Sequence, residues 1–361
     1  MSKRVLIGMS GGIDSTVAAI LLQEQGYELV GATFRTFDVV MDAPLYNSKG
    51  CCSEDSITEA QKMAHALGIE HHILDFRNTF HQYVVKNFVE EYAAGRTPNP
   101  CVMCNSHIKW GKLLEAADAL GCNYVATGHY AQIAEFRGHL YLKNAVDVVK
   151  DQTYFLWMLT ENNLRRTIFP LGGLTKTQVR QIALEHGYET LSKKSESQDI
   201  CFIPNNDYRT FLLEQGLQIK PGNYIDGTGK ILGQHCGFCN YTIGQRKGLG
   251  IALGTPKHVL KIDAHTNTVI LGDHDELYTC DVQASDICIR DMQWLTDSPQ
   301  VTARIRYKSP AVSATLQLSP MNNSLLPIAN LHFDKPVWGV TPGQSLVIYK
   351  DGLLIGGGII Q

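Results

Sequence analysis

Residues 5–15 read VLIGMSGGIDS, a short apolar run followed by two glycines and a polar cluster. The apolar run predicts a buried strand over 5–9, the glycines predict a sharp turn, and the spacing after Ile13 predicts a helix that stops at Gly26. Such a turn presents backbone N–H groups and the positive end of a helix to one point. We therefore expect a phosphate-binding loop. It lacks the Gly-Lys-Ser/Thr ending of γ-phosphate-cleaving enzymes.

The same strand–helix alternation continues toward residue 127. Strands are expected over 28–34, 71–76 and 123–127, and helices over 53–67, 80–94 and 105–120. Strands separated by helices form parallel βαβ units, so the fold class is α/β with a doubly wound parallel sheet. Helices are also expected over 151–159 and 175–186, the second with a capping box from Thr175 and Gln178.

The texture of the sequence changes at about residue 204. Glycine-containing turns such as Asp226-Gly227 multiply there, and alternating strands dominate from about Thr279. Asp351-Gly352 between two apolar runs predicts a tight hairpin. We expect a catalytic domain over 1–203, a small β-rich domain over 204–278 and a C-terminal β-barrel over 279–361.

Composition narrows the class of protein. With 361 residues, 44% hydrophobic and 19% charged, the chain is typical of a globular protein of several domains. Its net charge of −3 neither favours nor excludes a nucleic-acid binder. No apolar run reaches the ~18 residues of a membrane span, so we expect a cytoplasmic protein without a membrane partner. Ten cysteines in a chain of this length do not indicate a disulfide framework.

Two cysteines lie in polar stretches suited to chemistry. Residues 97–105 read TPNPCVMCN and lead into the expected helix 105–120, so the helix dipole and Lys109 favour a thiolate at Cys104. Cys201 follows the polar run 195–199. Sulfur transfer requires such a pair, one thiol that carries a persulfide and one that resolves it.

Several motifs carry a resemblance to known proteins. SGGIDS (10–15) resembles the signature of the N-type ATP pyrophosphatases. The whole set resembles the tRNA-specific 2-thiouridylase family. The motifs are SGGIDS (10–15), GRTPNP (95–100), MCN (103–105), TGHY (127–130), KDQTYFL (150–156), SQDICF (197–202), YTIGQRKGLG (241–250) and RIRY (304–307).

This resemblance implies an enzyme, a tRNA-uridine 2-sulfurtransferase with an N-terminal ATP pyrophosphatase domain. It would use ATP and Mg²⁺ to adenylate the C2 oxygen of a wobble uridine, and persulfide sulfur would replace that oxygen to give 2-thiouridine. The implied partners are a tRNA with a wobble uridine and a sulfur-donor protein of a cysteine-desulfurase relay. No resident metal is expected from the family pattern.

The resemblance also implies residue roles. Cys104 would be the nucleophile and Cys201 the persulfide carrier, with an alternative disulfide between them during turnover. The residues expected to hold ATP are Gly8, Met9, Ser10, Gly11, Gly12, Ile13, Asp14, Ser15, Phe34 and Gly128. Those expected to contact tRNA are Asn99, Pro100 and Cys101, at the flipped-out uridine, and Lys150, Asp151, Gln152, Arg306 and Tyr307.

Cys101 departs from the family pattern, because many members carry aspartate there. That leaves the acid–base role of this position open. Cys101, Cys104 and Cys201 also suit an iron–sulfur cluster with one open iron. For Cys51-Cys52, a role as sulfur relay or ligand and a role as a loop pair without chemistry are equally favoured. Cys236-x-x-Cys239 has zinc-like spacing, but a pair without chemistry is favoured there.

Three other functions remain open. An ATP pyrophosphatase acting on a small molecule, such as an amide-forming ligase, explains the loop but not the two thiols. A tRNA-binding scaffold that receives sulfur carriers would release no pyrophosphate. A disulfide oxidoreductase built on Cys101-x-x-Cys104 does not explain the phosphate loop.

Overall fold

The computed structural model describes residues 3–37, 54–193, 200–203, 206–319 and 327–361. The chain divides into two compact units. The first comprises residues 1–85, 100–207 and 351–354, and the second comprises 86–99, 208–350 and 355–361. Each unit is described separately, and the three-domain boundaries expected from the sequence stay a prediction. Within the described ranges, every helix is too short or too polar to cross a bilayer.

The first unit is built on a five-stranded sheet with the order β3-β2-β1-β4-β7. All of its strand pairs are parallel. The strands are β1 (Arg4–Gly8), β2 (Glu28–Arg35), β3 (Glu70–Asp75), β4 (Tyr124–Ala126) and β7 (Thr167–Ile168). The order runs outward from β1 to both edges, so the expected doubly wound sheet is confirmed. The loops after β1 and β4 meet where the order reverses, which is where such sheets bind ligands.

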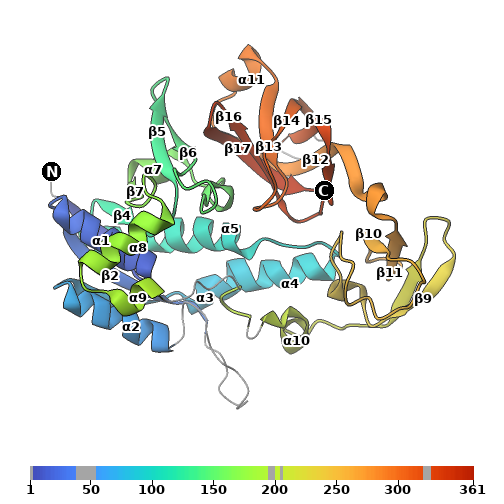
Figure 1. Cartoon of the computed structure of the whole chain (residues 1–361), viewed down its shortest axis with the longest axis horizontal. Coiled ribbons are helices and arrows are strands. Elements are labelled where there is room, and N and C mark those ends of the chain that lie inside the picture. Colours follow the sequence, from blue (N-terminus) through green and yellow to red (C-terminus); the bar gives the residue numbers. More distant parts are fainter. Residues whose placement is uncertain (1–2, 38–53, 194–199, 204–205, 320–326) are drawn as a thin grey trace. The chain divides into compact units, whose positions relative to one another are not determined.

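Three helices bury their apolar sides together with this sheet. They are α1 (Ile13–Glu24), α2 (Glu54–Ala66) and α8 (Lys176–Glu185), and α1 lies beside α8 in Figure 1. Val17, Ala60 and Val179, one from each helix, share a buried cluster with Val5 and Ile7 of β1. The predicted capping box at α8 is present, because Thr175 and Gln178 exchange hydrogen bonds.

Two helix predictions are wrong in instructive ways. The helix expected from residue 105 begins at Pro100, because proline suits the first helical position, where its missing N–H is not needed. It runs as α5 (Pro100–Cys104), the π-helical segment η2 (Asn105–Lys112) and α6 (Leu113–Ala119). The segment 151–159 forms only the 3₁₀ turn η3 (Thr153–Phe155), because the Asp151 carboxylate bonds nearby backbone and hydroxyl groups instead.

The second unit contains two β structures. The smaller is a four-stranded sheet with the order β10-β11-β8-β9, whose buried core includes Tyr224, Val259 and Val269. Its strands are β8 (Gly222–Ile225), β9 (Ile231–His235), β10 (His258–Asp263) and β11 (Thr268–Gly272). The β-rich region expected after residue 204 is therefore confirmed in its class.

The larger structure is a closed antiparallel barrel of six strands, as expected for the C-terminal region. The order β12-β15-β14-β13-β16-β17 closes through the additional pairing of β12 with β17. Asp351 and Gly352 both have positive φ and form the predicted tight hairpin. The strands are β12 (Tyr278–Ile289), β13 (Gln300–Arg304), β14 (Val312–Ser319), β15 (Ile328–Trp338), β16 (Ser345–Lys350) and β17 (Leu353–Ile360).

The remaining elements are short. They are α3 (Arg77–Phe80), η1 (His81–Val85), α4 (Lys86–Ala93), β5 (Gln132–Phe136), β6 (His139–Lys143), α7 (Glu161–Arg165), α9 (Glu189–Lys193), α10 (Tyr208–Glu214), η5 (Phe238–Asn240), η6 (His274–Leu277) and α11 (Gln293–Asp297).

Closure of the barrel gives a test of the fold. A Cβ added at Gly356 would lie 2.4 Å from the Cys288 carbonyl oxygen of the paired strand. Gly356→Val should therefore destabilise the protein by about 1–3 kcal/mol through overpacking, measured as a lower thermal midpoint. Gly227→Ala is the control, because its added methyl meets nothing within 4 Å. A midpoint equal to or above that of wild type would contradict the described closure.

Candidate active site

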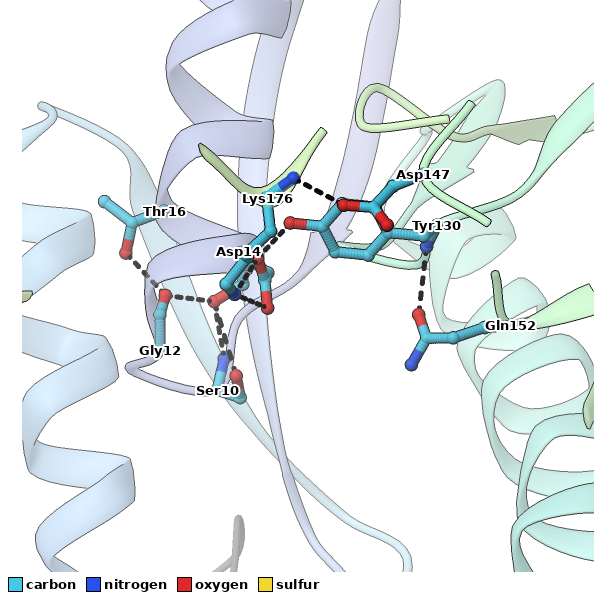
Figure 2. A network of polar contacts seen from close by, with 9 residues as sticks. Ser10, Gly12, Asp14, Thr16, Tyr130, Asp147, Gln152 and Lys176 are labelled. Atoms are coloured by element: carbon cyan, nitrogen blue, oxygen red, sulfur yellow. Dashed lines mark hydrogen bonds and ion pairs between the residues drawn. The ribbon is translucent and has the colours of Figure 1, made fainter. Parts of the chain in front are cut away.

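The loop between β1 and α1 is held by its own hydroxyl groups (Figure 2). The Ser10 backbone N–H donates to Ser15 Oγ at 3.2 Å, and Ser15 Oγ donates to the Gly12 carbonyl at 3.1 Å. Gly11 has φ +68°, and its backbone lies so close to α2 that a Cβ would be 2.8 Å from Glu59 Cβ. The loop is thus fixed, and its backbone N–H groups and the N-terminus of α1 face one common position, as an anion site requires.

Asp14, in the first turn of α1, gathers residues from two distant segments. Lys176 Nζ donates to both of its carboxylate oxygens at 2.7 and 2.8 Å, and the Tyr130 hydroxyl donates to Oδ1 at 2.8 Å. Figure 2 shows Lys176 and Tyr130 converging on Asp14. The Lys176 ammonium also lies 5.8 Å from the centre of the Tyr130 ring. The carboxylate charge at the loop is therefore neutralised by a buried lysine.

The residues expected to hold ATP are brought together by the fold. The Gly128 backbone approaches α1 so closely that a Cβ would lie 2.8 Å from the Asp14 carbonyl carbon and 2.9 Å from Ser15 N. Phe34, partly exposed at the end of β2, would be 3.4 Å from a Cβ at Gly8. A glycine-lined surface with an aromatic ring at its side fits a nucleotide, with phosphates at the loop and the base near Phe34. Their contact with ATP stays a prediction.

The cysteine helix differs from its expected form. Since the helix begins at Pro100, Cys101 occupies its first turn and Cys104 lies at the end of α5, where η2 begins. Cys101 is exposed and Cys104 is partly buried. Surrounding protein atoms desolvate the Cys101 thiolate and raise the pKa of this thiol, although solvent contact limits the effect, and the Lys109 ammonium opposes it.

Lys109 connects the cysteine helix to the segment after β4. Its Nζ lies 3.3 Å from His129 Nε2, and His129 Nδ1 lies 2.7 Å from Thr127 Oγ1. His129 is 8% exposed, and its burial, helped by Lys109, holds its pKa well below the ordinary value. A neutral His129 accepts from the Lys109 ammonium at Nε2, so its Nδ1–H donates to Thr127.

Cys201 also belongs to the first unit. It lies in a turn and is partly exposed, while its neighbour Phe202 is 2% exposed and packs edge-on against Phe80 at 5.4 Å. The structure does not show the expected Cys104–Cys201 disulfide. Part of the SQDICF motif, residues 197–199, lies outside the described residues, as do Cys51 and Cys52.

The loop after β6 holds three of the expected tRNA-contact residues. Asp151 is buried, and its carboxylate accepts from Ala145 N at 2.7 Å and Thr153 Oγ1 at 2.6 Å, which gives it a structural task. Gln152 Oε1 accepts from Tyr130 N at 2.9 Å. Lys150 is partly exposed at the end of a turn. Of the three, Lys150 is best placed for a phosphate contact.

Asp147 organises that turn and also bonds the first residue of α8. Its Oδ1 accepts from the backbone N–H groups of Val149 and Lys150 at 3.1 Å each. Its Oδ2 accepts from Lys176 N at 2.8 Å, the first residue of α8 (Figure 2). One carboxylate, that of Asp147, therefore bonds both the turn 147–150 and the backbone of Lys176, whose side chain pairs with Asp14.

Asn99, Arg306 and Tyr307 belong to the second unit, and Asn99 directly precedes Pro100, where the cysteine helix begins. Arg306 Nη2 donates to the Ile243 carbonyl at 3.1 Å and to the Gly339 carbonyl at 2.6 Å. It also donates to Thr341 Oγ1, and the guanidinium lies 5.6 Å from the centre of the Trp338 ring. Arg306 therefore connects the YTIGQRKGLG motif to the segment after β15. A contact of Arg306 with tRNA stays a prediction.

Sequence reasoning missed Lys176, the partner of Asp14. The only local signal was a basic residue at the first position of a capped helix, where it looks like an ordinary surface charge. The pairing of Lys176 with Asp14 depends on the packing of α8 beside α1, which no local pattern specifies.

Gly128 offers a test of the nucleotide site. Gly128→Ala places a methyl within 3.0 Å of Asp14 and Ser15, so the loop must shift and ATP should bind at least about 10-fold more weakly, because a displaced N–H group loses a charge-assisted hydrogen bond. Isothermal titration calorimetry with ATP measures this. Gly173→Ala, whose methyl meets nothing within 4 Å, should bind ATP normally. Unchanged affinity in Gly128→Ala would place the nucleotide elsewhere.

Comparison with known proteins covers nearly the whole chain. Three family models match: "tRNA methyl transferase HUP domain" over residues 3–205, "tRNA methyl transferase PRC-barrel domain" over 209–273 and "Aminomethyltransferase beta-barrel domain" over 284–360. Among solved structures, a 4-thiouridine synthetase–RNA complex with bound ATP is 20% identical. It covers 59% of this chain and 50% of its own, with a TM-score of 0.38.

Relatives of full length are far more similar. The tRNA-specific 2-thiouridylase MnmA of Natranaerobius thermophilus is 46% identical, covering 100% of this chain and 98% of the relative. The same enzyme of Halothermothrix orenii is 46% identical, covering 99% of both chains. That of Amoebophilus asiaticus is 45% identical, covering 99% of this chain and 95% of the relative. This chain belongs to the tRNA-specific 2-thiouridylase family.

Proposed function

We propose that this chain is an ATP-dependent sulfurtransferase that converts a tRNA uridine into 2-thiouridine. Full-length similarity to 2-thiouridylases supports this reaction class. The observation that carries it structurally is a phosphate loop and a helix with two thiols in one compact unit, linked by the Lys109–His129 contact.

The first step is activation of the base. The uridine C2 oxygen attacks the α-phosphorus of ATP, a P–O bond to the β-phosphate breaks and pyrophosphate leaves. The product is an O-adenylated uridine, whose C2 substituent is now a good leaving group. The glycine loop and the N-terminus of α1 bind the phosphates through N–H groups and a positive dipole end. Phe34 and the backbone at Gly128 would hold the adenosine.

The second step is delivery of sulfur. The terminal sulfur of a persulfide on Cys201 attacks C2, and the C2–O bond breaks as AMP leaves. Cys104 thiolate then attacks Cys201 Sγ, which releases the thiouridine and leaves a Cys104–Cys201 disulfide. Alternatively, the same attack occurs first and frees hydrosulfide, which adds to C2. Either order ends in the disulfide, so a thiol reductant must reset the enzyme before the next persulfide is loaded.

Two metal groups are relevant to this site, an iron–sulfur cluster on the three cysteines and Mg²⁺ at Asp14. Within the described part of the chain, no three His, Cys, Asp or Glu side chains gather as a metal site, so Cys101, Cys104 and Cys201 do not form a cluster site as arranged. Asp14 is occupied by Lys176 and Tyr130. Mg²⁺ would therefore enter mainly on the ATP phosphates and neutralise their charge. Its direct contact with Asp14 would require Lys176 to move.

The identity of the partners extends the proposal. The substrate would be a tRNA with a wobble uridine that leaves its stack to reach Cys104. A sulfur-donor protein from a cysteine-desulfurase relay would load the persulfide onto Cys201, which has the solvent access that such loading requires. A cytoplasmic location would bring these partners together.

Two reactions test the assignment separately. Wild type with unmodified tRNA, ATP, Mg²⁺ and a persulfide donor should form 2-thiouridine, measured by nucleoside mass spectrometry. Cys104→Ser and Cys201→Ser should each lower this rate at least about 1,000-fold, because a hydroxyl cannot replace the thiolate in sulfur transfer. Both variants should still release pyrophosphate on tRNA addition, since adenylation precedes sulfur transfer.

Cys236→Ser is the matched control, because this exposed thiol belongs to the second unit. It should retain both reactions at the wild-type rate. Thiolation by either active-centre serine variant would refute the residue roles. Pyrophosphate release without thiouridine in wild type would assign the chain to another adenylating reaction.

A further inference from the structure

Lys109 stands between the two halves of the proposed reaction. It lies on the cysteine helix, five residues after Cys104, within the π-helical segment η2. Its ammonium contacts His129, which follows Gly128, whose backbone touches the start of α1 in the phosphate loop. Insertions of π-helix are often found at functional sites. The contact therefore joins the side that holds the thiols to the side that holds the phosphates.

His129 is held firmly enough to aim this lysine. The rings of Trp110 and Phe169 pack against it, with centres 5.4 and 6.3 Å away. Trp110 is fixed in turn, because its Nε1–H donates to Thr167 Oγ1 at 2.7 Å. The hydrogen bond with Thr127 sets the orientation and tautomer of the imidazole. His129 thus offers Nε2 as an acceptor from a fixed position.

Within the part of the chain that the structure describes, no carboxylate pairs with the Lys109 ammonium. Its ammonium lies 3.3 Å from His129 Nε2, and burial holds the pKa of that imidazole well below the ordinary value. Lys176 contrasts with it, because Asp14 takes up the charge of that lysine at 2.7 Å. An oriented ammonium with an uncompensated charge is suited to an anion that forms during a reaction.

We propose that Lys109 is a catalytic cation of the thiolation reaction, and that His129 and Thr127 are its positioning residues. This inference rests on the proposed function. Negative charge grows on the α-phosphoryl oxygens when the uridine oxygen attacks, and on the AMP oxygen when sulfur displaces it. Both charges form between the base and the phosphates, where the Lys109–His129 contact joins the two sides. The ammonium would bind the transition states more tightly than the separated substrates.

The test measures adenylation without sulfur transfer. Lys109→Met should lower kcat for tRNA-dependent pyrophosphate release at least about 100-fold, as expected for loss of one preorganised charge-stabilising group. KM for ATP and Kd for tRNA should stay within about 3-fold of wild type, because ground-state binding relies on other residues. Lys109→Arg, which keeps the charge, should recover at least about 10-fold of the loss. It also serves if the methionine variant does not fold.

Lys112→Met is the matched control on the same helix. Lys112 pairs on the surface with Glu115 at 2.6 Å, so this variant should release pyrophosphate at the wild-type rate. His129→Phe keeps an aromatic ring between Trp110 and Phe169 but removes the acceptor at Nε2. It should lower kcat about 10-fold while KM for ATP stays unchanged, whereas a purely structural role would lower the thermal midpoint and leave kcat of the folded fraction intact.

The outcomes separate the two proposals. If wild type releases no pyrophosphate with ATP and tRNA, the proposed function fails. If wild type is active and Lys109→Met keeps its kcat, the inference about Lys109 is overturned. If Lys109→Met instead binds tRNA at least 10-fold more weakly with less salt dependence, Lys109 is a tRNA phosphate contact and the catalytic role is again overturned.

Discussion

The ion pair between Asp14 and Lys176 is the constraint on which the nucleotide site depends. Asp14 lies in the first turn of α1 and Lys176 begins α8, so the pair fixes the two helix starts next to each other, and Tyr130 adds the segment after β4. The Lys176 side chain is only 10% exposed, so its ammonium would be costly without a partner, while the Asp14 side chain is 32% exposed. The pair therefore determines the arrangement of three segments that are distant in sequence.

The cysteine helix is joined to this arrangement by polar contacts rather than by apolar packing alone. Asn105 Nδ2 donates to the Phe155 carbonyl at 3.0 Å, which fastens the helix to the KDQTYFL motif, and Gln152 of that motif holds Tyr130. The KDQTYFL motif, whose family resemblance implies tRNA contact, thus also connects the cysteine helix to Tyr130 inside the first unit. Its residues divide between these tasks: Asp151 and Gln152 face inward to protein groups, and Lys150 stays accessible.

Local patterns predicted the elements whose structure depends on nearby residues. The glycine turn after Met9, the capping box at Thr175 and the hairpin at Asp351-Gly352 follow from rules that involve only a few neighbouring positions. The helix over 151–159 failed because Asp151 bonds Ala145, an interaction that no periodicity reveals. Lys176 was similarly hidden, because its partner Asp14 lies 162 residues away in the chain. Lys109 was predicted to act on Cys104, but its contact with His129, 20 residues away, was not predicted.

Asp147 offers the first unit a route for thermodynamic linkage, because one carboxylate bonds both an exposed turn and the start of α8. The turn from Asp147 to Lys150 exposes Val148 by 72% and Val149 by 84%, yet its backbone is bonded to the same carboxylate as the first residue of α8. A ligand that orders this turn lowers the entropy cost of fixing Lys176. By reciprocity, a nucleotide that fixes Lys176 favours the same turn conformation to an equal extent in free energy. The affinity for a ligand at the turn and the affinity for a nucleotide at the loop would then depend on each other.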